Sequence, residues 1–138
     1  EGPLAHLDDA PLAAGVIDLV LGYRDRVRNS MLILPCDDRG AALPTPILVG
    51  DVDWSEPAPG RRRSLGFLAE FPAPGLVVAL SARQPLPDLL VRGWLRTVED
   101  TLGDSGRALL AFGVAGLDEV EIVGGRAARN GTLDRRAG

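Results

Sequence analysis

The sequence contains no lysine, one cysteine and one histidine, and the shortages of cysteine and histidine exclude classes of site. Cys36 alone cannot form an internal disulfide or a cysteine-rich zinc site, and His6 has no second histidine with which to hold a metal. All fifteen basic residues are arginines, and nineteen aspartates and glutamates outnumber them, which gives a formal net charge of −4. Because phosphate backbones require a basic field, this composition argues against nucleic acid as a partner. We also predict no cofactor.

Long apolar runs are missing as well. Runs such as Gly75 to Leu80 are far shorter than the stretch needed to cross a bilayer. The acidic segment from Glu1 to Asp9 lacks the basic region of a signal peptide. A single cysteine suits a reducing compartment. We therefore expect a cytoplasmic protein that does not insert into a membrane.

What is present is the composition of an ordinary globular domain. The chain has 138 residues, of which 46% are hydrophobic and 25% are charged, and this length suits one hydrophobic core rather than two. We predict a single α/β domain over residues 1–125. Residues 126–138 are polar and aperiodic, and are expected to form a disordered tail.

The apolar periodicities predict the order helix, strand, strand, helix, strand, helix, strand, strand. A hairpin followed by strands that helices separate indicates one mixed sheet flanked by helices. The run Gly75 to Ala82 is typical of a central strand covered on both faces, and Glu119 to Val123 is expected at an edge. The predicted elements are Ala10 to Tyr23, Ser30 to Leu34, Pro46 to Val49, Arg61 to Phe71, Gly75 to Ala82, Pro87 to Gly103, Arg107 to Val114 and Glu119 to Val123.

The common enzyme motifs are absent, since the chain has no GxxxxGK[ST], GxGxxG, HExxH or GxSxG sequence. Four aspartates in two neighbouring loops are the remaining acidic candidates, namely Asp37, Asp38, Asp51 and Asp53. If they converge, their oxygens suit Mg²⁺. Aspartates are also ordinary turn residues, because their side chains bond to nearby backbone, and we favour that interpretation.

Two further features carry candidate chemistry. Cys36 follows a predicted strand, but Asp37 and Asp38 beside it raise the pKa of the thiol, so we predict an inert, partly buried side chain. Arg61, Arg62 and Arg63 form the sharpest local charge cluster. They could bind a phosphate or an acidic partner, but arginines at a helix start oppose the helix dipole and more often form a solvated face, which is the interpretation we favour.

Five segments occur in an order that resembles the RadC-like branch of the JAB/MPN metalloprotease fold: Met31 to Gly40, Leu76 to Leu80, Pro85 to Asp88, Trp94 to Val98 and Ala108 to Phe112. The resemblance implies a strand with an acidic turn, a core strand and a metal-ligating aspartate, for which Asp88 is the counterpart. Where that family carries His-x-His, this chain has Leu80 to Arg83, which supplies no imidazole. The resemblance therefore implies a metal-free version.

These observations lead to two functional hypotheses. The first is a non-catalytic α/β domain that acts through protein binding or self-association. Trp54, in a polar loop, is its predicted interface anchor beside Arg61 to Arg63, because large aromatic and arginine side chains dominate interfaces. The alternative is a Mg²⁺-dependent phosphate-ester hydrolase, with the four aspartates around the ion and the three arginines on phosphate.

Overall fold

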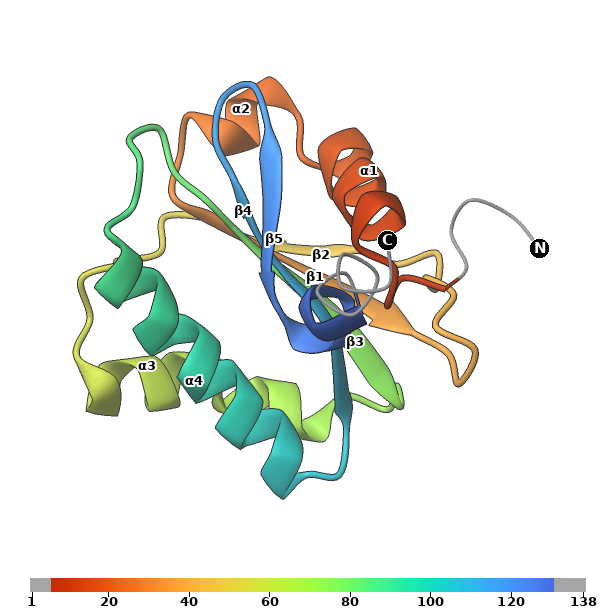
Figure 1. Cartoon of the computed structure of the whole chain (residues 1–138). Coiled ribbons are helices and arrows are strands. Elements are labelled where there is room, and N and C mark those ends of the chain that lie inside the picture. The colour runs from red at the N-terminus through yellow and green to blue at the C-terminus, as the bar shows by residue number, and fades with distance from the viewer. Residues whose placement is uncertain (1–5, 131–138) are drawn as a thin grey trace.

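The computed structural model describes residues 6–130, which form one five-stranded sheet with helices against both faces (Figure 1). The strand order across the sheet is β2-β1-β3-β4-β5. The sheet is mixed, because some neighbouring strands are parallel and others are antiparallel. The predicted mixed α/β sheet is confirmed, and the predicted order of elements holds with three short helical segments added, in the described residues, at 23–26, 66–70 and 125–130.

Strands β1 (Ser30–Cys36) and β2 (Ile47–Val49) form the antiparallel hairpin that the sequence predicts, with Leu32 opposite Leu48. β1 was expected to stop before Pro35, but it continues to Cys36. Proline is tolerated there because β2 pairs only with the first half of β1, so the far end resembles a sheet edge on that side. The Pro35 carbonyl still accepts a hydrogen bond from the Leu43 amide at 2.8 Å.

Strand β3 (Gly75–Ser81) occupies the centre of the sheet, and each of its residues is buried. It runs antiparallel to β1 and parallel to β4 (Ala108–Ala115). Its Gly, Leu, Val and Ala side chains need no polar partner, which is why a continuous apolar run predicts a strand covered on both faces. Strand β5 (Val120–Gly124) pairs with β4 and forms the sheet edge opposite β2, as predicted.

One face of the sheet is covered by α3 (Ala58–Leu65), the 3-10 helix η1 (Gly66–Glu70) and α4 (Asp88–Asp104). The sequence predicts a single helix from Arg61 to Phe71. The observed helix begins earlier, with proline in its first turn, and tightens to 3-10 geometry at Gly66. α4 buries an apolar stripe against the sheet, as its four-residue spacing predicts.

The other face is covered by α1 (Ala10–Val20), which packs against β4 and β5. The Asp9 carboxylate caps this helix by accepting a hydrogen bond from the Leu12 amide at 3.1 Å. α1 ends before Tyr23 because Leu21 is extended, and the short α2 (Tyr23–Arg26) follows.

Residues 125–130 are helical and return to the α1 side of the sheet. Gly125 has a φ of +80°, and a Cβ there would lie 2.8 Å from the Ala111 Cα, so only glycine allows this turn. Ala127 is fully buried. The predicted disordered tail is therefore wrong over 126–130, because a buried alanine anchors the segment, and 131–138 lie outside the described residues.

Candidate interaction surface

The four aspartates of the predicted acidic site do not converge. Asp37 and Asp38 follow the last residue of β1, whereas Asp51 and Asp53 lie beside its first residue, where the Val52 amide donates to the Asn29 carbonyl. A strand of seven residues spans roughly 20 Å. Within residues 6–130, no group of three or more His, Cys, Asp or Glu side chains is placed to hold a metal ion.

Two of these carboxylates act as turn residues. Asp37 accepts hydrogen bonds from the amides of Arg39 at 2.9 Å and Ala41 at 3.0 Å, and these bonds lower its pKa. Asp53 accepts from the amide and hydroxyl of Ser55, which lower its pKa in the same way. Both carboxylates therefore stabilise their own loops, which is the interpretation favoured from the sequence.

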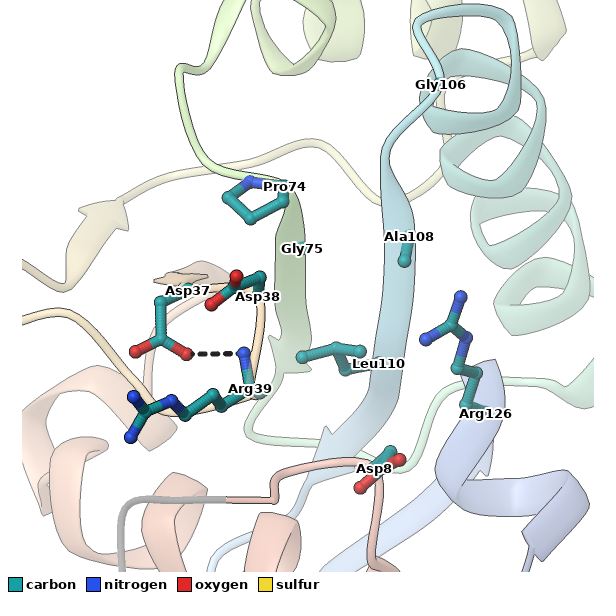
Figure 2. Close-up of a pocket in the computed structure, with 11 residues that line it drawn as sticks. Asp8, Asp37, Asp38, Arg39, Pro74, Gly75, Gly106, Ala108, Leu110 and Arg126 are labelled. Atoms are coloured by element: carbon teal, nitrogen blue, oxygen red, sulfur yellow. Dashed lines mark hydrogen bonds between the residues drawn. The ribbon is translucent and has the colours of Figure 1, made fainter.

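A cavity of about 300 Å³ lies where β3 and β4 begin, and Figure 2 shows its lining. Charges of both signs surround it, from Asp8, Asp37, Asp38, Arg39 and Arg126. In the figure, the Asp37 carboxylate accepts a hydrogen bond from the backbone amide of Arg39. The mixed charge gives the cavity no single ligand preference.

Cys36 is fully buried beside this turn. Burial, followed by the charge of Asp37, raises the pKa of its thiol to about 12. The thiol is therefore protonated near neutral pH, which suppresses its nucleophilicity. The inert thiol expected from the sequence matches this environment, and its burial is more complete than expected.

Trp54 is not an exposed interface anchor, and that prediction is wrong. Its side chain is only 3% exposed, and its indole Nε1 donates to the Ser81 carbonyl at 3.0 Å. The ring packs edge-on against Trp94 at a centroid distance of 5.0 Å, and the Trp94 Nε1 donates to the Trp54 carbonyl at 2.8 Å. Because each indole finds both a ring and an acceptor inside the protein, the loop folds inward.

The three adjacent arginines have different environments. Arg61 is half-buried, and its guanidinium donates to the Glu56 carbonyl at 2.9 Å and the Thr97 hydroxyl at 3.3 Å. Arg62 and Arg63 are exposed. Arg61 therefore connects α3 to α4 through hydrogen bonds, whereas Arg62 and Arg63 are exposed to solvent.

The clearest apolar surface lies on α1, and the sequence analysis did not identify it. Leu12, Gly15 and Leu19 face outward at helical spacing, and Leu19 is 81% exposed. Tyr23, the first residue of α2, is 72% exposed. The signal available in the sequence was that Asp18 is the only charged residue of α1, whereas a solvated helix normally carries a polar face.

That single charge is paired with a buried arginine, although the Asp18 side chain is itself 60% exposed. The buried Arg26 guanidinium donates to the Asp18 carboxylate at 2.6 Å and to its carbonyl at 3.1 Å. It also donates to the Leu21 carbonyl and to the Leu117 carbonyl in the turn between β4 and β5. Arg26 thus joins α1, α2 and this turn, and Leu117 is itself partly exposed. We call Leu12, Gly15, Leu19, Tyr23 and Leu117 the α1 surface.

Comparison of the chain with family models, with curated proteins and with solved structures found no match. The resemblance to the RadC-like branch therefore stays a prediction. Among the described helices, none combines the length and the apolar character that crossing a bilayer requires.

Proposed function

We propose that this chain is a non-catalytic binding domain that self-associates through the α1 surface. The observation that carries the proposal is an outward helix face with two exposed leucines and no uncompensated charge, continued by Tyr23. Apolar surface of this kind on a rigid helix is characteristic of protein interfaces, where tyrosine is also enriched.

A second copy of the chain fits this surface because the surface is self-complementary. Leu12 and Leu19 lie on either side of Gly15, where an added Cβ would meet no atom within 4 Å. When two α1 helices pack antiparallel about Gly15, Leu19 of each copy lies against Leu12 of the other. The small residue between them permits a close approach, and the arrangement has the two-fold symmetry of common homodimers.

The charges at the two ends of α1 favour the same antiparallel arrangement. Asp8 and Asp9 precede the helix, and Arg24 lies exposed beyond its C-terminal end. An antiparallel pair brings the two aspartates of one copy toward Arg24 of the other, at both ends of the interface. Complementary charge at the rim favours this register over the parallel one, in which like charges meet.

The geometry gives less support to the phosphate-ester hydrolase. Its aspartates lie at opposite ends of β1, and two of them are engaged in their own turns. Arg61 lines a cleft between helices α3 and α4, and none of the four aspartates belongs to that lining. The proposal therefore rests on binding.

Sedimentation velocity over a wide concentration range tests the proposal. We expect a concentration-dependent monomer–dimer equilibrium that Leu19→Asp weakens by at least about thirtyfold, the effect of losing about 2 kcal/mol at a central contact. Leu89→Asp is the matched control, because Leu89 on α4 is 83% exposed and lies outside the α1 surface.

Two results would contradict the proposal. A wild-type chain that stays monomeric at every concentration excludes self-association. A dimer that Leu19→Asp and Leu89→Asp weaken equally excludes the α1 surface as its interface. Circular dichroism of both variants distinguishes a lost interface from a lost fold.

A further inference from the structure

We propose that the arginine end of the cleft between α3 and α4 binds a phosphate-type anion, as a free ion or as the phosphate group of a larger ligand. The cleft has a volume of about 160 Å³. Three arginines from two helices line it, namely Arg61, Arg62 and Arg96. Because it lies across the sheet from α1, the inference is independent of the proposed self-association.

Arg61 is held in place before any ligand arrives. Its Nη1 donates to the Glu56 carbonyl, and its Nε donates to the Thr97 hydroxyl, which in turn donates to the Gly93 carbonyl at 2.9 Å. Within residues 6–130, its Nη2 has no hydrogen-bond partner. A fixed guanidinium with an unused donor loses little side-chain entropy when it binds an oxyanion.

The position of this guanidinium depends on a glycine inside α4. A Cβ at Gly93 would lie 3.1 Å from the Arg61 Cζ and 3.2 Å from its Nη2. Glycine lowers helix stability relative to alanine, so its presence in the middle of a long helix calls for a reason. Here the missing side chain allows the planar guanidinium of Arg61 to lie against the helix backbone.

The electrostatic environment favours an anion at one end of the cleft. Ala58, in the first turn of α3, shares the lining with the arginines, and no side chain caps that turn. The amides of that turn add positive potential to that of the guanidinium groups, and the Glu56 carboxylate beside Gly60 offsets part of it. Asp100 and Asp104 also line the cleft, one and two turns beyond Arg96 along α4, whereas Arg61 lies against Gly93, one turn before Arg96.

The geometry of the guanidinium groups favours a tetrahedral oxyanion as the ligand. Each presents parallel N–H donors that match the oxygens of phosphate, and several groups around one small cavity suit a tetrahedral oxyanion with more than one negative charge. The cavity volume is on the scale of a single phosphate group rather than an extended polyanion.

An NMR titration of the full chain with inorganic phosphate, at pH 7 and constant ionic strength, tests the inference. We expect saturable amide shifts confined to Ala58–Arg62 and Gly93–Thr97. Arg62→Ala and Arg96→Ala should each weaken the fitted affinity by at least about fivefold, since both remove a charge-assisted contact. The matched control is Arg63→Ala, which removes an exposed arginine next in the chain and outside the cleft.

Gly93→Ala provides a second, independent variant. It retains all three arginines but displaces the Arg61 guanidinium, so phosphate affinity should fall several-fold while circular dichroism remains that of the folded chain. The inference is overturned if wild-type shifts do not saturate, if they spread over unrelated arginines, or if Arg63→Ala weakens binding as much as Arg62→Ala does.

Discussion

Helices α1 and α4 cover opposite faces of the same sheet, yet they present different surfaces to solvent. α4 is amphipathic, with Trp94 and Val98 buried and with Arg92, Arg96 and Asp100 exposed. α1 buries Val16 and Ile17 but exposes leucine on its other side. Only α4 has the polar outer face that a helix on a monomer surface normally carries.

The difference shows that the two layers complete their burial in different ways. On the α4 side, the paired tryptophans and the α3 layer enclose the core, and charged side chains finish the surface. On the α1 side, the buried Arg26 pairs with Asp18, the one charged residue of the helix, and the rest of the exposed face is apolar or glycine. The α4 layer is complete in one chain, whereas the α1 layer is suited to a second.

The largest expected effect concerns the α4 layer. Trp94→Ala removes a fully buried indole, its ring contact with Trp54 and a hydrogen bond, and should lower the free energy of unfolding by about 3–5 kcal/mol. Urea denaturation measures this loss. Leu89→Ala, an exposed change on the same helix, should stay within about 0.5 kcal/mol. A loss under about 1 kcal/mol for Trp94→Ala would show that the tryptophan pair does not organise this layer.

A smaller effect is expected at Arg26, where the α1 layer is tied together. Arg26→Met keeps most of the side-chain volume but removes the donors to the carbonyls of Leu21 and Leu117, and should cost about 1–3 kcal/mol in urea denaturation. It also leaves Asp18 unpaired on α1, so the dimer should weaken in sedimentation. Asp18→Asn is the control, with a loss below about 1 kcal/mol because the carboxylate is largely exposed. Equal losses for the two variants would contradict the role assigned to the buried arginine.

The sequence predicts the sheet well because strand signals depend on local composition. The run Gly75 to Ala82 and the hairpin before it need no tertiary information to be identified as strands. Helix boundaries are less predictable. The extended Leu21 and the change to 3-10 geometry at Gly66 depend on packing against the rest of the fold.

The candidate sites were harder to predict, because whether a polar loop folds inward is decided by partners far along the chain. Trp54 has the sequence surroundings of an exposed residue, yet its acceptor belongs to Ser81 and its ring partner is Trp94. Likewise, Asp37 and Asp51 are close in sequence, but the strand between their loops separates them. The exposure of Leu19 was not predicted, because periodicity does not separate exposed from buried leucines in a helix whose only charged residue is Asp18.

The smallest effect separates the two helices most directly. Gly15 in α1 and Gly103 in α4 both leave open space where a Cβ would lie, so either change to alanine should stabilise the monomer by up to about 1 kcal/mol through helix propensity. Urea denaturation in the Leu19→Asp background measures this gain without dimerisation.

In the wild-type background, Gly15→Ala also fills the gap between Leu12 and Leu19 that the second copy would enter, and the dimer dissociation constant should rise several-fold. Gly103→Ala should leave that constant unchanged, because α4 lies outside the proposed interface. If the two alanines prove equivalent in sedimentation as well as in denaturation, α1 is no more an interface than α4, and the contrast between the two layers has no functional meaning.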